Sequence, residues 1–271
     1  MTEIQSKLFE LKQLIKKCGA AAVAFSGGVD SSFLSKIVFD ELNSNSLAIT
    51  ISGNMMPESE LAASKKIAES IGIKHIIINA EGIDEKVRPN PIDRCYHCKK
   101  IEFGIIKAKA AEFGINYVFD GSNADDENDY RPGLKAIEEL SVVSPLRLCA
   151  LSKLEIRILS KELKLETYDK PSYACLASRI PFGDEITKEK LNTVESAEEF
   201  LKAKGLRQFR VRHHGNICRI EISPDERYKF FDCQIIDEVS KYMKTLGFIY
   251  VCMELEGYKT GSLNPKTEIE L

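Results

Sequence analysis

Short apolar runs alternate with amphipathic segments along the first 120 residues of the chain. The runs have the length of buried strands and lie at 20–24, 46–51, 74–78 and 116–120. The segments between them, and an opening one at 1–17, place apolar residues at helical spacing, as Leu8, Leu11 and Ile15 show. This alternation predicts a parallel, doubly wound α/β sheet, which binds ligands beyond the C-terminal ends of its strands.

The pattern changes after residue 140. Residues 142–146 predict a fifth strand at the sheet edge, because Pro145 lacks the N–H that a central strand needs. The remaining expected elements are a helix at 153–163, a loop at 168–183, a helix at 187–204, strands at 207–214 and 217–223, a helix at 224–246 and a strand at 248–255. We therefore expect two domains, a nucleotide-binding domain at 1–183 and a smaller α/β domain at 184–271 that binds substrate or mediates oligomerisation.

Composition narrows the functional classes. The 271 residues are 44% hydrophobic and 29% charged, which is ordinary for a globular protein, and the net charge of −3 argues against bulk capture of nucleic acid. Apolar runs stay shorter than the roughly 20 residues that span a bilayer, and the charged N-terminal segment lacks a signal-peptide core. We expect a cytoplasmic protein without membrane contact, whose eight cysteines are thiols or metal ligands.

One turn in the pattern carries candidate chemistry. Residues 25–32 read FSGGVDSS and join a predicted strand to a predicted helix. Its glycines let the backbone approach a ligand, while its serine hydroxyls and the free N–H groups of the helix favour an anion. Asp30 stands where a Walker loop carries its lysine, and an acid beside phosphates is compatible with an intervening Mg²⁺.

The string SGGVDS resembles the signature of the PP-loop ATP pyrophosphatases. The resemblance implies cleavage of ATP between its α- and β-phosphates and adenylylation of a substrate, with Asp30 as a catalytic residue. The implied ATP-binding residues are Ser26, Gly27, Gly28, Asp30, Ser31 and Ser32.

Cys95 and Cys98 lie just before a predicted helix, at a spacing that lets two thiolates bind one metal ion or cluster. The same spacing fits a redox pair of the thioredoxin type, a zinc site completed by His97 or another histidine, or two structural cysteines. The other cysteines lie in apolar or strand patterns and are expected in the core. These are Cys18, Cys149, Cys218, Cys233 and Cys252, with Cys175 treated separately.

Cys175 lies in a predicted loop with the sequence KPSYACLASRIP. This loop resembles the sulfur-donating loop of the LarE family, ATP-dependent sulfur transferases that supply the thiocarboxylates of a nickel-pincer nucleotide cofactor. The resemblance covers nearly the whole chain. The matching segments are 26–31, 120–121, 126–135, Cys175 with Ser178 and Arg179, and the predicted hairpin with Arg210–Arg212 and Arg219–Glu221.

Two subsets of the LarE family differ in their cysteines. Members with one sulfur cysteine sacrifice it, leaving dehydroalanine, and lack counterparts of Cys95 and Cys98. Members with three cysteines are understood to hold a four-iron four-sulfur cluster, and this chain resembles them through Cys95, Cys98 and a catalytic Cys175. Thiolates suit such clusters, and three would leave one iron able to hold and transfer a hydrosulfide. Zinc stays an alternative, because residue types do not separate it from a cluster.

Two further groups of residues gain a role from the resemblance. Arg210 and Arg212 are two apart in a predicted strand, so they share a face and can clamp a phosphate, or they form an ordinary solvated face. The acidic segment at 125–133 is either a solvated turn or a substrate or subunit contact. The candidate substrate-binding residues are Arg210, Arg212, Glu127, Asn128, Arg131 and Glu198, with Asp232 also expected near the site. His213 and His214 are expected at the surface.

The resemblance to the LarE family implies the expected reaction. Mg-ATP adenylylates a carboxylate of pyridinium-3,5-biscarboxylic acid mononucleotide, and sulfur from the three-cysteine cluster replaces AMP to give a thiocarboxylate. Inorganic sulfide or another donor supplies the sulfur, and the protein is expected to form a homo-oligomer. One alternative is a PP-loop tRNA thiolase with a similar cluster, although the negative charge disfavours RNA. Another is a metal-binding or redox-sensing protein that keeps the loop without catalysis.

Overall fold

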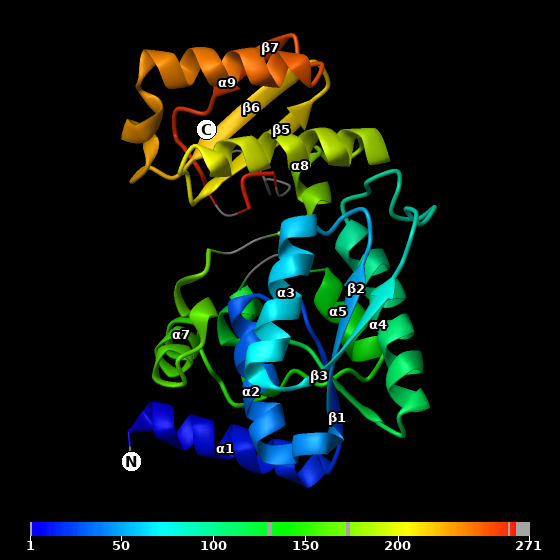
Figure 1. Ribbon diagram of the computed structural model, residues 1–271. Helices are drawn as coiled ribbons and strands as arrows, with labels where there is room; N and C mark the ends of the chain where they lie inside the picture. Colours follow the sequence, from blue (N-terminus) through cyan, green and yellow to red (C-terminus); the bar gives the residue numbers. More distant parts are fainter. Residues whose placement is uncertain (1, 129–131, 172–173, 260, 264–271) are drawn as a thin grey trace. The chain divides into compact units, whose positions relative to one another are not determined.

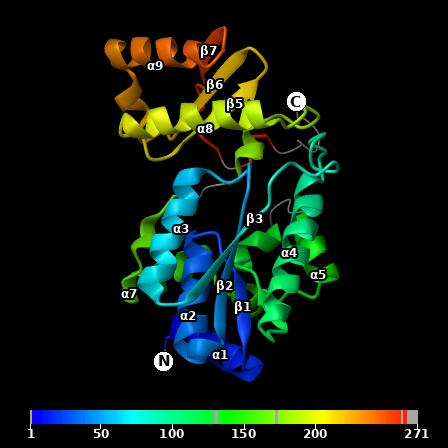
Figure 2. The ribbon, with the colours of Figure 1, turned by 45° about the vertical axis from the view of Figure 1, so that its right-hand side comes forward.

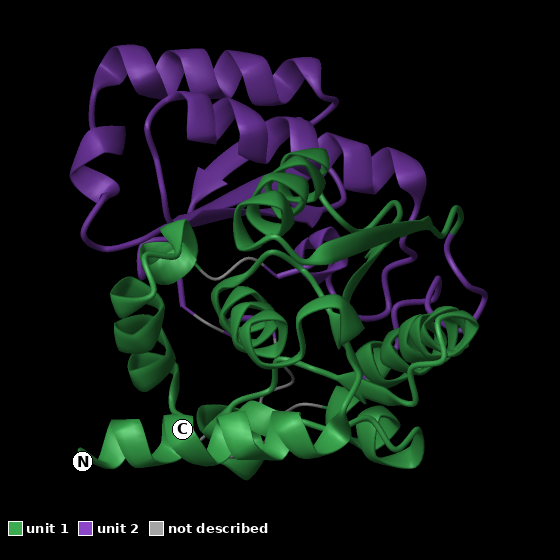
Figure 3. Cartoon of the chain, turned by 60° about the horizontal axis from the view of Figure 1, so that its bottom comes forward, with its two compact units in different colours: residues 1–82, 93–173 green, residues 83–92, 174–271 purple. Residues whose placement is uncertain are grey.

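The computed structural model describes residues 2–128, 132–171, 174–259 and 261–263. The chain forms two compact units, and the second takes a short insertion from the first half of the sequence (Figures 1 and 3). Unit 1 comprises Met1–Gly82 and Asp93–Tyr173, and unit 2 comprises Ile83–Ile92 and Ala174–Leu271. The assignment of nucleotide binding to 1–183 and substrate binding to 184–271 stays a prediction. Among the described residues, no helix is long and apolar enough to cross a membrane.

A four-stranded sheet forms the centre of unit 1, in the order β3-β2-β1-β4. The strands are β1 (Ala21–Ala24), β2 (Ser46–Ser52), β3 (Lys74–Asn79) and β4 (Tyr117–Phe119). All pairs are parallel, with Ala24 opposite Ile49 and Ile51 opposite Ile78. The predicted α/β class with a parallel sheet is therefore confirmed.

Helices cover both faces of this sheet, as Figure 2 shows. One face packs against α2 (Val29–Leu42) and α3 (Glu58–Ile71), with α1 (Glu3–Cys18) and α7 (Lys153–Glu162) outside them; the other packs against α4 (Arg94–Glu112) and α5 (Gly133–Glu139). Successive residues of β1 enter different cores, since Ala22 packs with Phe103 of α4 and Val23 with Phe33 of α2. This two-residue alternation is why short apolar strands specify a sheet that is buried on both faces.

The predicted fifth strand at 142–146 is wrong. Val143 makes one isolated parallel bridge to Phe119, and Pro145 then begins the short helix α6 (Pro145–Leu148) with Ser144 at its N-cap. Proline suits the first position of a helix because its fixed φ is helical and its missing N–H would have lacked a partner there. The missing N–H of Pro145, which predicted a strand at the sheet edge, is equally compatible with the first position of a helix.

Unit 2 contains a three-stranded sheet, in the order β5-β6-β7. Strands β5 (Phe209–His214) and β6 (Ile217–Ile222) form the predicted hairpin, and β7 (Tyr250–Met253) pairs with β6 in parallel. Helices α8 (Lys188–Ala203) and α9 (Cys233–Thr245) pack on the sheet through residues such as Leu201 and Met243. The insertion 83–92 belongs to this unit because the side-chain amide of Asn90 donates to the Ile180 and Pro181 carbonyls at 3.1 and 2.6 Å.

The predicted helix at 224–246 is shorter than expected. A 3-10 turn, η5 (Arg227–Phe230), precedes it, and α9 begins only at Cys233. Asp232 caps α9, because its Oδ1 accepts the Gln234 N–H at 2.8 Å. Asp232 therefore has a structural role as the N-cap of α9.

Cysteine burial corrects another expectation. Cys149 and Cys218 are buried and Cys18 is half-buried, but Cys233 and Cys252 are exposed rather than in the core. Burial raises the pKa of the Cys218 thiol to about 12, so this thiol stays protonated and unreactive at neutral pH. Strand alternation explains Cys252, since neighbouring strand residues point to opposite faces.

Candidate active site

The phosphate-loop motif lies where the sequence predicts it, between the C-terminal end of β1 and the start of α2. Gly28 is the N-cap of α2, and Asp30 lies in its first turn. The Ser26 and Ser31 hydroxyls are 3.1 Å apart, and the Gly28 N–H donates to Ser26 Oγ at 3.4 Å. The turn thus presents hydroxyls beside the positive end of a 14-residue helix, an arrangement that favours anions.

Glycine is favoured at the two positions of the turn for different structural reasons. Gly27 has a φ of +70°, and a Cβ there would lie 3.0 Å from the Cα and Cβ of Ser64 in α3. Gly28 has an extended backbone, and an added Cβ would meet Ser26 Oγ at an ordinary 3.4 Å. Gly27 is therefore required by the fold. Gly28 could accept a Cβ, so its lack of a side chain suits the close approach of a ligand rather than a need of the fold.

Ser32 differs from the other serines of the loop. It is fully buried, its N–H donates to the Gly28 carbonyl at 3.0 Å, and its Oγ has no hydrogen-bond partner among the described residues. Its side chain is therefore inside the fold rather than on the surface of the loop.

A lysine that the sequence did not single out contacts Asp30. Lys153 begins α7, and its Nζ forms an ion pair with Asp30 Oδ2. The Asp30 and Lys153 side chains are 22% and 32% exposed, so solvent reaches both. The Walker loop carries its lysine within the motif, whereas here a lysine 123 residues away supplies a cation to the same turn. A pattern of neighbouring residues could not have revealed it.

The segment after β4 holds this pair in place. The Asn123 amide donates to Asp30 Oδ1 at 3.5 Å, and Asp125 Oδ2 accepts the Lys153 backbone N–H at 2.9 Å. Asp126 accepts the Asn123 N–H at 3.0 Å and is buried, so this part of the acidic run is internal scaffold rather than a solvated turn. Gly121 is also in close contact with the loop, since an added Cβ would lie 3.2 Å from the Ser31 nitrogen.

Three predicted substrate contacts in the acidic segment have no described side chains. Glu127 and Asn128 end the 3-10 turn η2 (Ala124–Asn128), and their backbone alone is described. Arg131 lies outside the described residues. Their predicted roles in substrate positioning stay predictions.

Cys95 and Cys98 lie in the first two turns of α4 in unit 1. Their i, i+3 spacing places them on one helix face, where Cys95 is exposed and Cys98 is half-buried. The Cys98 thiol donates to Glu102 Oε1 at 3.3 Å. Within the described ranges, no group of three His, Cys, Asp or Glu residues is close enough to hold a metal ion.

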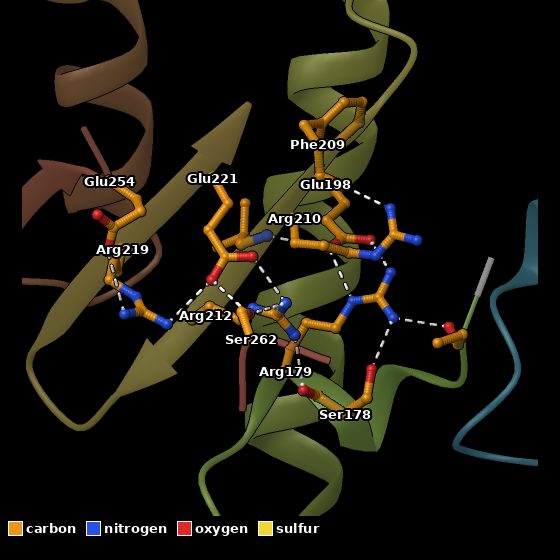
Figure 4. A network of polar contacts seen from close by, with 12 residues as sticks. Ser178, Arg179, Glu198, Phe209, Arg210, Arg212, Arg219, Glu221, Glu254 and Ser262 are labelled. Carbon is orange, nitrogen blue, oxygen red and sulfur yellow. Dashed lines mark hydrogen bonds and ion pairs between the residues drawn. The ribbon is translucent and has the colours of Figure 1, made fainter. Parts of the chain in front are cut away.

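Cys175 belongs to unit 2, where it is exposed and precedes the 3-10 turn η4 (Leu176–Arg179). Arg179 fixes the backbone of this segment, because its Nη1 donates to the Ala174 and Cys175 carbonyls at 2.7 and 3.1 Å (Figure 4). Arg179 is itself fully buried and forms two bonds of 2.8 Å to the Glu198 carboxylate. Glu198, predicted to contact substrate, is thus paired with an arginine of the cysteine loop.

The arginine pair of the β5–β6 hairpin is buried rather than solvated. Arg210 is 2% exposed and its guanidinium lies 4.8 Å from the ring centre of Tyr258. Arg212 donates to the Ser178 carbonyl at 2.9 Å and to Glu221 Oε2 at 2.7 Å, while its buried Nε has no hydrogen-bond partner among the described residues (Figure 4). Arg210 and Arg212 lie two apart on β5, as the predicted common face requires, and the Glu221 carboxylate of β6 occupies part of that face.

The histidines that follow this pair are only partly exposed. His213 and His214 are half-buried, and burial lowers the pKa of both imidazoles. Burial therefore favours the neutral form of both rings, and the two residues lie partly at the surface where the sequence predicted surface residues.

The family model of the NAD synthases matches residues 3–117 of the chain. This region carries the phosphate loop and the strands β1 to β3, and it ends at the first residue of β4.

Curated relatives extend the similarity over the whole chain. The pyridinium-3,5-bisthiocarboxylic acid mononucleotide synthase of Lactiplantibacillus plantarum is 32% identical, covering 97% of this chain and 96% of the relative. An uncharacterised protein of Synechocystis is 41% identical over 96% of this chain and 98% of its own length. A glutamine-hydrolysing GMP synthase chain of Thermoplasma volcanium is 30% identical over 69% of this chain and 64% of its own length.

Proposed function

Because the chain belongs to the LarE family of ATP-dependent sulfur transferases, we propose that it converts a carboxylate of pyridinium-3,5-biscarboxylic acid mononucleotide to a thiocarboxylate. The observation that carries the proposal is the phosphate loop, in which Asp30 and Lys153 pair at the start of α2. Full-length similarity to a synthase of the bisthiocarboxylic acid mononucleotide supports the substrate class.

The first step is adenylylation at the phosphate loop. The substrate carboxylate attacks the α-phosphorus of ATP, the bond to the β-phosphate oxygen breaks, and pyrophosphate leaves. The hydroxyls of Ser26 and Ser31, the Gly28 N–H and the N-terminus of α2 stabilise the charge on the phosphates. Lys153 contributes a cation for the departing pyrophosphate.

Mg²⁺ fits the donors at this loop. Asp30 is a partly exposed carboxylate whose other oxygen accepts from Asn123, and oxygen ligands are those that Mg²⁺ prefers. Asp30 would hold the ion against the phosphates, which would release Lys153 from its ion pair. When bound, Mg²⁺ neutralises charge on the phosphate oxygens.

The second step delivers sulfur. Cys95, Cys98 and Cys175 would hold a four-iron four-sulfur cluster, because thiolates are the ligands that suit such a cluster. Cys95 and Cys98 share a face of α4, and Cys175 is exposed in its own unit. When bound, such a cluster would supply a site for an exogenous sulfur ligand, and the side chains of its three cysteine ligands would be retained. The chain reinforces the third ligand, because Arg179 holds the Cys175 carbonyl and Glu198 holds Arg179.

The hairpin of unit 2 would bind the phosphate of the mononucleotide. Arg212 supports this role because the Nε of its buried guanidinium has no hydrogen-bond partner in the part of the chain that the structure describes. Arg210 lies two residues away on the same strand face. Glu127, Asn128 and Arg131 complete the proposed set of substrate contacts. Assembly as a homo-oligomer and use of inorganic sulfide or another sulfur donor are part of the same proposal.

Turnover of a defined substrate tests this function. Protein purified without oxygen is incubated with Mg-ATP, sulfide and the pyridinium biscarboxylic acid mononucleotide, and AMP, pyrophosphate and thiocarboxylate are quantified. We expect all three products in equal amounts, and an Asp30→Ala variant that releases pyrophosphate at the full rate would disprove the assignment of the loop. A parallel reaction with unmodified tRNA distinguishes a tRNA thiolase, which would thiolate the RNA instead.

Metal analysis tests the cluster separately. The same preparation should contain iron and acid-labile sulfide, with the broad visible absorption of an iron–sulfur protein, and Cys95→Ser should lose both. A colourless, zinc-loaded protein with normal activity would disprove the cluster and leave the sulfur transferase assignment intact.

A further inference from the structure

Lys170 lies in unit 1 and contacts the phosphate loop from a distant part of the sequence. Its Nζ donates to the Gly27 carbonyl at 3.0 Å and to Glu60 Oε2 at 2.7 Å. The Lys170 and Glu60 side chains are only 17% and 11% exposed, so the ion pair is largely shielded from water. Neither residue belongs to the loop motif, and Glu60 lies in the first turn of α3.

The main chain of Lys170 is fixed as firmly as its side chain. Arg157 of α7 donates from Nη2 to the Lys170 carbonyl at 2.9 Å and from Nη1 to the Tyr168 carbonyl at 2.7 Å. The Lys170 N–H donates to Thr167 O at 3.0 Å, at the end of the 3-10 turn η3 (Glu166–Asp169). Lys170 is therefore an anchored cation rather than a mobile surface lysine.

The bond to Gly27 determines how the loop presents its N–H groups. A trans peptide is planar, so the N–H of the following residue points opposite to the carbonyl. With the Gly27 carbonyl held by Lys170, the Gly28 N–H points to the other side of the turn, where Ser26 Oγ lies. Gly27 has a positive φ and could otherwise populate several backbone conformations, because glycine restricts rotation least.

We propose that Lys170 is a positioning residue that locks the Gly27–Gly28 peptide of the phosphate loop in the orientation that receives the phosphates of ATP. This inference rests on the proposed ATP site and adds a residue to it. Lys170 acts through the peptide, and Glu60 serves as the counter-charge that keeps the Lys170 side chain in place.

Paired substitutions separate this role from simple charge balance. Lys170→Met leaves the Glu60 carboxylate unpaired beside an anion site, so its effect mixes repulsion with loss of the peptide contact. Lys170→Met combined with Glu60→Gln removes the repulsion and the buried charge, while the peptide stays unheld. Glu60→Gln alone keeps an oxygen acceptor for Lys170, and Lys170→Arg restores a cationic donor.

Calorimetry on the full chain measures the Kd of the protein for the Mg²⁺ complex of α,β-methylene ATP. Thermal melting of each variant shows whether it is folded. A lost hydrogen bond to a charged donor weakens binding about tenfold or more, so we expect that change for Lys170→Met and for the double variant. Glu60→Gln and Lys170→Arg should stay within about threefold of the parent, the former because its neutral acceptor keeps the lysine bond. Double-variant binding that returns to the parent value would overturn the positioning role.

Failure of this inference is distinguishable from failure of the proposed function. If Asp30→Ala abolishes nucleotide binding and the double variant binds normally, the ATP site stands and Lys170 has no part in it. If Asp30→Ala also binds normally, the loop is not the ATP site.

Discussion

The phosphate loop of unit 1 and the arginine network of unit 2 satisfy their polar groups in different ways. The loop presents hydroxyls and a helix N-terminus around an ion pair that solvent reaches, so a ligand can replace the partners of Asp30 and Lys153. In the network, Arg179 is fully buried on Glu198, and Arg212 is bonded to Glu221. A short motif can thus identify a loop whose polar groups are accessible to a ligand. The buried arginines, in contrast, already form ion pairs within the fold, so any role in substrate binding is combined with a structural role.

The largest expected effect is on the stability of unit 2. Arg179→Met would remove the guanidinium from the buried Glu198 carboxylate, which would still accept the Val211 N–H at 3.0 Å. Breaking a buried ion pair costs about 3–5 kcal/mol. Urea unfolding measures the free energy, and the matched control is Arg179→Met with Glu198→Gln, which removes the stranded charge. If the single variant were as stable as the parent, Arg179 would not be a structural anchor of the Cys175 segment.

The next largest effect concerns the solvent-accessible ion pair of the loop. Lys153→Met should slow pyrophosphate release about 10²–10³-fold, equivalent to about 2.7–4 kcal/mol, because one preorganised charge on the leaving group is lost. Melting should change little, since the pair is partly exposed. Lys161→Met, on the same helix α7, is the control, and an equal loss of rate there would remove any special role for Lys153.

The sequence predicts the phosphate loop but not the lysines that contact it. The strand–turn–helix pattern predicts the loop correctly because its residues are neighbours and the local chemistry of glycine and serine dictates the turn. Lys153 and Lys170 reach the loop across 123 and 143 residues, and a lysine in a helix or loop looks like any solvated lysine. Only the fold brings them to Asp30 and Gly27.

The parallel sheet was predictable for a similar reason. Apolar strands alternating with amphipathic helices leave few ways to bury both faces, so the order of elements indicates the α/β class. Val143 and Pro145 show where this reasoning fails, since an apolar pair followed by proline fits both a strand edge and a helix start. Burial of Arg210 and Arg212 was also hidden, because the pattern of a strand does not reveal which face is covered.

A smaller effect tests whether Arg212 recognises substrate in addition to supporting the hairpin. Arg212→Lys keeps a positive charge for Glu221 but loses the guanidinium fork, so KM for the mononucleotide should rise by the equivalent of about 1.5–3 kcal/mol, tenfold or more, with kcat nearly unchanged. Steady-state kinetics and melting on the same preparation separate the two roles. A normal KM with a lowered melting temperature would mean that Arg212 is structural alone.

The smallest effect compares the two glycines of the loop itself. Gly27→Ala should destabilise the protein by about 1–2 kcal/mol, because its left-handed backbone disfavours a Cβ and Ser64 lies 3.0 Å from that position. Gly28→Ala should change the free energy of unfolding by about 0.5 kcal/mol or less, since its extended backbone accepts any residue. Binding of Mg²⁺ with α,β-methylene ATP should nevertheless weaken in Gly28→Ala, because the methyl group occupies the space that the phosphates need. If Gly28→Ala bound the nucleotide normally, ATP would not bind on the side of the turn that Gly28 faces. The phosphate loop would then not differ from the arginine network in being accessible to a ligand.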